Sequence, residues 1–439
     1  MVCELAPASW RLAGYAQSTR TTHRLPIQHA PPFNLSGQSG IAGMRDEPVF
    51  DWRTIGALNA VSTLAQVGQF GIAFVMLPVW LAQQGLDASQ LGLFAASLWL
   101  GQLPGLALAP RLCQRLGERR VIVLGLLCTL CALAWISLLG WPYWLAGGFL
   151  SGFGLGLRWI GVEPWLYRIA PAQARGRLVG FHETLIALAP IIAPLLANFF
   201  GMHGQAVFWI GAAFTVAALL PLALARAPVV EPAPQAARGP WVNPLRQARE
   251  HVFKQGLVIA SVGGMIEAAV SGLFALFTQG HGMTVNQTAD LLAVFGLGGL
   301  LMQYAIGWLA DHRGVGKAAL VCALGTATVC IALALSMPYA LVVAAVFLLG
   351  GFITSFLTLA LIASTLATSG SMAGNVSTMS MVYTVSAVAG PLLAGASIKA
   401  SHGDALMWLT AAAASVMALL LTWWLREPLP AGPVQPAGR

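Results

Sequence analysis

The sequence predicts an all-α membrane protein in which twelve transmembrane helices form two pseudo-symmetric six-helix bundles. The first observation is composition: 57% of the 439 residues are apolar and only 9% are charged, whereas soluble domains carry about 25% charged residues. The second is that the apolar residues form long stretches, each near the roughly 20 residues that a helix needs to cross the hydrocarbon. The third is an internal repeat with an offset of 197 positions.

Two separate motifs carry this repeat. The segment Pro-Leu-Leu-Ala at 194–197 recurs at 391–394, and Leu112 with Gly117 recurs as Leu309 with Gly314. Many secondary transporters are duplicated bundles of apolar helices with their working site where the halves meet. The repeat therefore makes transport the first functional hypothesis.

Six predicted spans lie on each side of a long polar interruption. In order along the chain the spans are 56–80, 88–109, 121–140, 143–165, 179–201, 206–226, 256–279, 288–310, 317–336, 339–362, 376–398 and 405–425. A membrane β-barrel would instead show alternating segments of about ten residues. These runs are too long and too continuous for that design, and Pro142 and Pro338 mark tight hairpins between adjoining helices.

The remaining segments divide the chain. Residues 1–50 are mixed in composition and are predicted to be a disordered N-terminal tail. The first bundle, 51–226, is followed by a cytoplasmic linker at 227–255, which is rich in Pro, Ala and Arg and ends in a short basic surface helix. The second bundle covers 256–426, and the Pro- and Gly-rich C-terminal tail covers 427–439.

The positive charge is distributed by loop. Of the 23 Lys and Arg residues, Arg158 lies within a span and only Lys399 lies in a loop that leads from an odd-numbered to an even-numbered span. The other 21 lie in the tails or in even-to-odd loops, and basic loops stay cytoplasmic. We therefore predict a multi-pass membrane protein with both termini cytoplasmic. This distribution accounts for the net charge of +8, so we expect no nucleic-acid partner. We expect a monomer within the lipid bilayer.

Motifs at equivalent places in the two halves resemble those of the major facilitator superfamily (MFS), and the resemblance covers about 51–426. The family's loop after the second helix of each half reads G-x-L-A-D-R-x-G-R-R. Here the copies are GWLADHRG, with Asp311, and PRLCQRLGERR, with Gln114 in place of Asp. The Gly-Pro signature of the eleventh helix is present as Gly390-Pro391. The segments GGLLMQYAIGWLAD and RGRLVG are similar to a bacterial subgroup of undefined substrate. The resemblance implies the MFS fold and a bacterial inner membrane.

Glu267 is the candidate proton-coupling residue. It lies about eleven residues, or roughly 16 Å, into the span 256–279 and so near the bilayer midplane. A carboxylate at this depth is costly and usually faces a partner or a wet cavity, often to carry protons or contact substrate. The alternative is a protonated side chain that only fixes helix packing.

Arg158 is the candidate substrate-binding cation. It lies within the span 143–165 and needs a counter-anion or water because it cannot shed its charge. The i, i+5 spacing turns Glu163 about 140° away, so a partner on another helix is expected. The resemblance implies that the first and fourth helices of each half line the cavity, which would let Arg158 and Glu267 face it together. A purely structural pair with some acid is the alternative.

Two further groups complete the candidate sites. Gln66 and Trp159 are predicted to contact substrate. A gate is predicted on the cytoplasmic side, where salt bridges would form in one orientation and break in the other. Its residues are Glu163, Glu183, Asp311, Arg115 and Arg177, with His182 beside them. The resemblance implies that Asp311 acts as a latch and that Gln114 weakens the matching latch in the first half. The alternative for Asp311 is a charged loop that caps a helix end. The alternative for Glu163, His182 and Glu183 is a solvated loop cluster.

No enzyme signature is present in the sequence. The chain has no GxxxxGK[ST] phosphate loop and no HExxH motif, so we expect neither ATP-driven pumping, nor a cofactor, nor a metal site. Cys128-x-x-Cys131 has no companion pair and is interpreted as two core thiols.

The leading hypothesis is a proton-coupled secondary transporter that exports a small organic molecule by alternating access. The alternatives are proton symport of a small organic anion held by Arg158, a sensor of the same fold that does not transport, and a channel.

Overall fold

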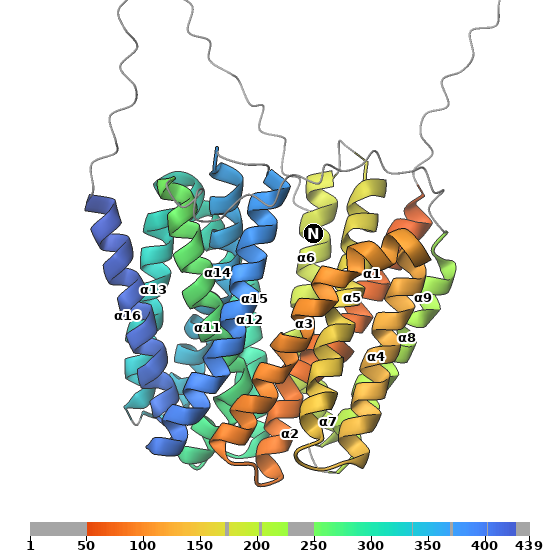
Figure 1. The fold of residues 1–439 in the computed structure, drawn as a ribbon. Helices are drawn as coiled ribbons and strands as arrows, with labels where there is room; N and C mark the ends of the chain where they lie inside the picture. The colour runs from red at the N-terminus through yellow and green to blue at the C-terminus, as the bar shows by residue number, and fades with distance from the viewer. Residues whose placement is uncertain are drawn as a thin grey trace, which may run out of the picture. The chain divides into compact units, whose positions relative to one another are not determined.

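The computed structural model describes residues 51–171, 175–201, 204–226, 250–335, 337–368, 372–401 and 403–426. The regular elements within these ranges are all helices (Figure 1). The predictions for the N-terminal tail, for most of the 227–255 linker and for the C-terminal tail lie outside the described residues.

Six membrane-crossing helical units form the first half of the chain. The first is a continuous path of α1 (Trp52–Gln66), the π-helix η1 (Val67–Met76) and α2 (Leu77–Gln83). The others are α3 (Ala88–Leu116), α4 (Glu118–Leu138), α5 (Trp144–Ile169), α6 (Arg175–Ala187) with α7 (Ala189–Phe200), and α8 (Ala206–Ala217) with α9 (Leu219–Leu224).

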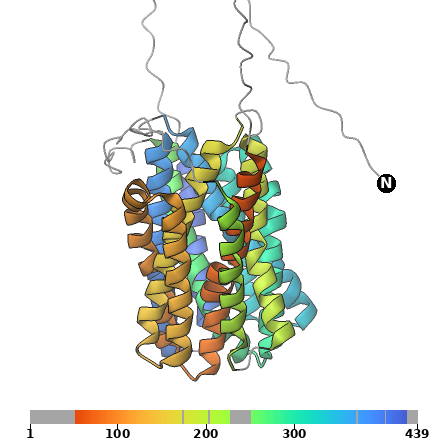
Figure 2. The ribbon, with the colours of Figure 1, turned by 90° about the vertical axis from the view of Figure 1, so that its right-hand side faces the viewer.

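The second half has six unbroken helices. They are α11 (His251–Gly280), α12 (Val285–Arg313), α13 (Val315–Ala334), α14 (Tyr339–Leu366), α15 (Met372–Ala400) and α16 (Ala405–Arg426). Among the described residues, the two halves together have twelve helices long and apolar enough to cross a membrane. The all-α prediction and the twelve predicted spans are therefore confirmed, and Figure 2 shows the helices from the side.

The repeat is visible in the helix caps. Asp87 with Gln90 forms a capping box at the start of α3, and Thr284 with Gln287, 197 positions later, forms one at the start of α12. A capping box satisfies otherwise unpaired N–H groups in the first turn. Both helices end at a glycine with positive φ, 85° at Gly117 and 87° at Gly314. Glycine adopts this conformation without the steric cost that a Cβ brings, which explains why the motif keeps it twice.

Several helix boundaries differ from the predicted spans. The helices α3 and α12 continue beyond the predicted ends at 109 and 310, so Arg115 and Asp311 lie on final helical turns and not in loops. The reason is that polar residues can extend a helix past the hydrocarbon until the glycine ends it. Similarly, α11 begins at His251, five residues before the predicted start at 256.

Glycines allow close helix packing in both halves. A Cβ added to Gly101 on α3 would lie 1.9 Å from the carbonyl oxygen of Phe149 on α5. In the second half, a Cβ on Gly298 of α12 would lie 1.9 Å from the carbonyl oxygen of Phe347 on α14. Small residues at such interfaces let membrane helices approach closely. The same helix pair is therefore locked in the same way in each half.

The halves meet through α3 and α15 at the odd-to-even end, where odd-numbered membrane-crossing units lead into even-numbered ones. A Cβ on Gly92 would lie 2.4 Å from the carbonyl oxygen of Pro391, and one on Gly395 would lie 2.5 Å from that of Ala88. Pro391 belongs to the repeated Pro-Leu-Leu-Ala segment. One copy of that motif therefore forms part of the contact between the halves.

Candidate functional site

A cavity of about 180 Å³ lies between the two halves. Its lining comes from α1, η1, α6 and α7 of the first half and from α11, α12 and α14 of the second. Most lining side chains are apolar, and the polar ones are Gln66, Glu183, Glu267, Ser271, Gln303 and Thr354. A larger hollow of about 660 Å³ between α1 and α6 has no ionisable lining residue among those described. The interhalf cavity is therefore the candidate site.

Glu267 lines this cavity from α11, in agreement with the prediction that it faces a crevice between the halves. Its Oε2 accepts a hydrogen bond from the hydroxyl of Tyr383 on α15. The backbone brings these groups together, because a Cβ on Gly264 would lie only 2.3 Å from the carbonyl oxygen of Tyr383. The adjacent Gly263 also faces the Tyr383 ring. The glycine pair therefore allows α15 to approach closely enough for the hydroxyl to reach the carboxylate.

Arg158 is enclosed behind the cavity. Only 1% of the residue is exposed, and its Nε donates to Oε1 of Gln69 at 2.9 Å. A second guanidinium nitrogen donates to Oε1 of Gln66. Gln69 is itself held by α4, because its Nε2 donates to Oγ1 of Thr129 at 2.7 Å. Within the described residues no carboxylate lies within 4.0 Å of the Arg158 guanidinium.

This placement corrects the expectation that Arg158 and Glu267 face the cavity together. Neither Arg158 nor Trp159 is among the described lining residues, whereas Gln66 is. The guanidinium carbon of Arg158 lies 5.9 Å from the centre of the Trp159 ring, so the two side chains pack on each other. The expected anionic partner on another helix is replaced by two neutral carboxamides. The helical spacing indicated that an ion pair with Glu163 would be poor, and no such pair is present.

Of the predicted gate residues, Glu183 also lines the cavity. Its Oε1 accepts a hydrogen bond from the hydroxyl of Tyr167 at 3.0 Å. Glu163 Oε1 is buried and has no hydrogen-bond partner among the described residues. His182 is fully buried, and its Nδ1 lies 3.0 Å from Oδ1 of Asn59. Both tyrosines that hold cavity carboxylates come from outside the set predicted as site residues.

The other predicted gate residues lie apart. Arg115, Arg177 and Asp311 are exposed, and in the described part of the chain none has an acidic or basic partner within 4.0 Å. The ion pair present at that end joins Arg168 to Glu118 at 2.7 Å, within the first half. Their role in a gate therefore stays a prediction.

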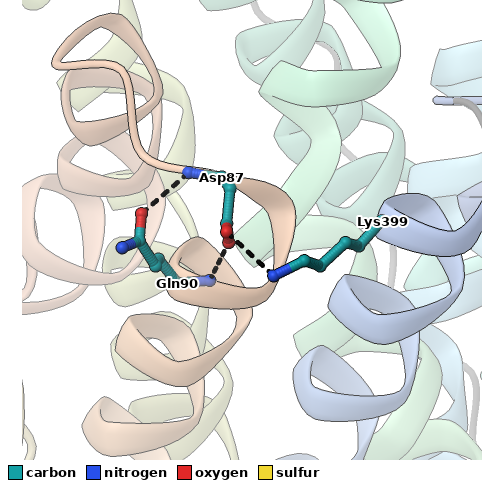
Figure 3. A network of polar contacts seen from close by, with 3 residues as sticks. All are labelled: Asp87, Gln90 and Lys399. Carbon is teal, nitrogen blue, oxygen red and sulfur yellow. Dashed lines mark hydrogen bonds and ion pairs between the residues drawn. The ribbon is translucent and has the colours of Figure 1, made fainter.

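At the odd-to-even end a polar contact does join the halves (Figure 3). Lys399 Nζ lies 3.1 Å from Oδ2 of Asp87, while Oδ1 of Asp87 accepts the backbone N–H of Gln90 at 2.8 Å. The Gln90 hydrogen bond and the Lys399 charge lower the pKa of Asp87. Asn198 on α7 also donates to Asp290 on α12 at 2.6 Å. The sequence singled out Lys399 as the exception to the charge distribution but did not predict its partner.

Comparison with known families and relatives agrees with this architecture. The model of the Major Facilitator Superfamily matches residues 60–379 and 264–439. An uncharacterized MFS-type transporter of Yersinia pestis (strain Pestoides F) is 28% identical over 244 residues, covering 54% of this chain and 62% of the relative. One from Enterobacter sp. (strain 638) is 25% identical over 241 residues, again covering 54% of this chain and 62% of the relative. The match therefore spans less than two thirds of these relatives.

Solved structures share the fold. A nucleoside transporter, NupG (D323A mutant), has a TM-score of 0.74 at 13% identity, covering 85% of this chain and all of that one. A D-xylose-proton symporter has a TM-score of 0.68 at 17% identity, covering 84% of this chain and 97% of the other. The family match extends over most of the chain, and the helical count, repeat and central cavity agree with it. The chain therefore belongs to the Major Facilitator Superfamily.

Proposed function

We propose that this protein exports a small organic molecule from the bacterial cytoplasm in exchange for protons, by alternating access across the inner membrane. The observation that carries the proposal is the position of Glu267, whose carboxylate lines the cavity between the halves. A carboxyl group at membrane depth is costly unless it serves a wet pathway or a partner. Here it has both a cavity and a tyrosine donor.

The geometry at Glu267 suits reversible protonation. The hydroxyl of Tyr383 donates to Oε2 and stabilises the ionised form, and no described residue is within hydrogen-bond distance of Oε1. Oε1 is therefore available to accept a proton from the cavity. Because α11 and α15 pack so closely at Gly264, this arrangement moves as one unit when the halves rotate against each other.

The contacts between the halves support an alternating mechanism. The Asp87–Lys399 and Asn198–Asp290 contacts join the halves at the odd-to-even end. At the opposite end the predicted gate residues Arg115, Arg177 and Asp311 lack ionic partners in the described part of the chain. Two discrete sets of contacts, one formed while the other is broken, are what a rocking equilibrium requires. We propose that this conformation opens toward the cytoplasm.

The proposed topology follows from charge. Arg and Lys lie mainly at the even-to-odd loops, which the positive-inside rule assigns to the cytoplasm together with both termini. The matched Yersinia and Enterobacter proteins are bacterial, which supports a bacterial plasma membrane. We propose a monomer, since the cavity is lined by the two halves of a single chain.

The placement of Arg158 bears on the alternatives. Uptake of an organic anion would require a cation in the cavity, but Arg158 is enclosed and already donates to two carboxamides. A sensor of the same fold would bind ligand without moving it, and it would lack the gradient-driven accumulation that the exporter must show.

Transport in proteoliposomes tests the proposal. Compounds that stabilise the purified protein in a thermal-shift screen are offered to inside-out vesicles with an acidic lumen. We expect them to accumulate in the lumen and to be released when an ionophore collapses the pH gradient. Glu267→Gln should abolish the accumulation without loss of folded protein, whereas Asp404→Asn, which removes a carboxylate outside the cavity, should not. Full accumulation by Glu267→Gln would contradict the proton-carrier role.

A further inference from the structure

The charges that line the cavity are all of one sign. Among the described residues its ionisable side chains are Glu183 from the first half and Glu267 from the second, and it has no Lys, Arg or His. The nearby cation, Arg158, is 1% exposed and is held behind Gln66. An anionic ligand would therefore meet two carboxylates without a compensating charge in the cavity, which is electrostatically unfavourable.

Each carboxylate is oriented by a tyrosine. Tyr167 donates to Oε1 of Glu183 at 3.0 Å, and Tyr383 donates to Oε2 of Glu267. The second oxygen of each carboxylate makes no hydrogen bond with a described residue, and Glu183 is exposed while Glu267 is half-buried. Each half thus presents one fixed acceptor that remains open to a ligand. A protonated amine can donate to these acceptors and has no acceptor capacity of its own. A quaternary ammonium has no N–H, and its positive charge alone attracts it to the same carboxylates.

The rest of the lining suits the apolar body of such a ligand. Phe70 and Phe295 contribute aromatic surface from opposite halves, together with aliphatic residues of α7, α11 and α12. Aromatic faces attract a cation that lies over the ring. The volume of about 180 Å³ is below the roughly 300 Å³ of typical drug-sized sites, which favours a compact ligand.

We propose that the transported molecule is a compact organic cation, an amine or quaternary ammonium with an apolar body, bound between Glu183 and Glu267. This inference rests on the proposed function, since it names the substrate class for the same cavity. A cation that touches carboxylates of both halves has contacts that depend on their relative orientation, as alternating access requires. Proton-coupled exchange then follows because the cation and protons compete for the same oxygens.

Binding of three probes of similar shape and different charge tests the inference. The purified full chain in detergent is titrated calorimetrically with benzyltrimethylammonium, with neopentylbenzene as its neutral carbon isostere, and with phenylacetate as an anion. A cation in contact with a carboxylate gains a charge–charge attraction that the neutral isostere lacks. We therefore expect the cation to bind at least about tenfold more tightly than the isostere, and the anion not to bind.

Variants identify the site. Glu183→Gln and Glu267→Gln should each weaken binding of the cation about tenfold or more and leave binding of the neutral isostere unchanged, whereas Asp404→Asn should alter neither. Size-exclusion profiles and thermal unfolding verify that each variant is folded. Absence of saturable binding of the cation, equal binding of the isostere, or tighter binding of phenylacetate would overturn the inference.

The same probes separate this inference from the proposed function. Specific binding of the cation without gradient-driven accumulation would uphold the ligand class and refute proton-coupled export. Gradient-driven accumulation of neutral or anionic compounds alone would uphold export and refute the ligand class.

Discussion

The two halves share one scaffold but differ in where they place their intramembrane charges. At the repeat offset of 197 positions, Glu267 of the second half corresponds to Phe70 of the first, and both line the cavity. Arg158 of the first half corresponds to Ser355, and both are buried. The capping boxes and the turn glycines are preserved at this offset, but the charges are not. The comparison shows that helix caps and turns are repeated in the two halves, whereas the intramembrane charged residues are not.

The surroundings of each charge explain its different placement. The first half has the π-helix η1, and Gln66 directly before it and Gln69 within it turn their carboxamide oxygens to Arg158. In the second half α11 is α-helical from His251 to Gly280, and the glycine pair beside Glu267 admits Tyr383. π-helical segments often occur at functional sites. Here the segment supplies acceptors for a cation that stays enclosed.

The strongest way to break this comparison is to remove Arg158. Arg158→Ala leaves two carboxamide oxygens without donors in the interior, and each buried unpaired group costs about 1 to 3 kcal/mol. We expect a loss of about 2 to 4 kcal/mol in the free energy of unfolding, measured by denaturation in detergent. Glu267→Ala leaves one donor, the Tyr383 hydroxyl, without its acceptor beside the cavity and should cost less, about 1 kcal/mol. Equal losses in the two variants would mean that both charges serve structure.

A second prediction tests whether the glycine pair positions the carboxylate. Gly264→Ala would place a Cβ 2.3 Å from the carbonyl oxygen of Tyr383, so α15 must shift, at a cost of about 1 to 3 kcal/mol. We expect lower thermal stability and impaired proton-driven transport. The control is Gly307→Ala on the exposed face of α12, where a Cβ meets nothing within 4 Å. There the change should be neutral or slightly stabilising.

Removal of the tyrosine hydroxyl gives a smaller effect at the same site. Tyr383→Phe deletes the donor to Oε2 of Glu267, and a hydrogen bond to a charged group contributes about 1.5 to 3 kcal/mol. We expect transport to require a higher pH, because the ionised carboxylate loses stabilisation. At a fixed pH, accumulation should fall about tenfold. The pH profile of accumulation in proteoliposomes measures it. An unchanged profile would show that the hydroxyl only packs against the carboxylate.

The smallest expected effect concerns Asp87 and its counterpart Thr284. Both cap a helix, but only Asp87 also pairs with Lys399, and these side chains are 46% and 60% exposed. Asp87→Ala should cost about 1 kcal/mol through its cap, as should Thr284→Ala. Lys399→Met should cost less than about 1 kcal/mol because an exposed ion pair is screened. Cysteines introduced at cavity-lining positions should nevertheless react more with a thiol reagent added on the odd-to-even side in Asp87→Ala and Lys399→Met. In Thr284→Ala this labelling should not increase.

This contact also has a predictable pH dependence. The pKa of Asp87 is lowered in the folded protein, first by the backbone N–H of Gln90 and also by Lys399. Its contribution is therefore complete above the unfolded carboxyl pKa of about 3.9 and is lost as the pH falls through the lower folded pKa. Labelling from the odd-to-even side should rise only in that acidic window. A rise near neutral pH would assign the opening to another group.

Much of the scaffold follows from the sequence because its signals are local. Hydropathy and length located all twelve membrane-crossing helices, and the repeat offset located turns that the structure forms with φ of 85° and 87°. The depth of Glu267 followed from counting residues along one helix. Gln66 was identified as a polar residue within a span, and it does line the cavity.

The tertiary structure alone decided which way the buried groups face and what they meet. The sequence places Arg158 within a helix, but its enclosure depends on Gln66, Gln69 and the Thr129 hydroxyl that orients Gln69 from a third helix. Likewise, the pairing of Lys399 with Asp87 joins residues 312 positions apart. Hydropathy reports the free energy of moving a segment into lipid, which is a property of that segment alone. Side-chain partners depend on how helices rotate and pack against one another, and those contacts form only when the whole bundle assembles.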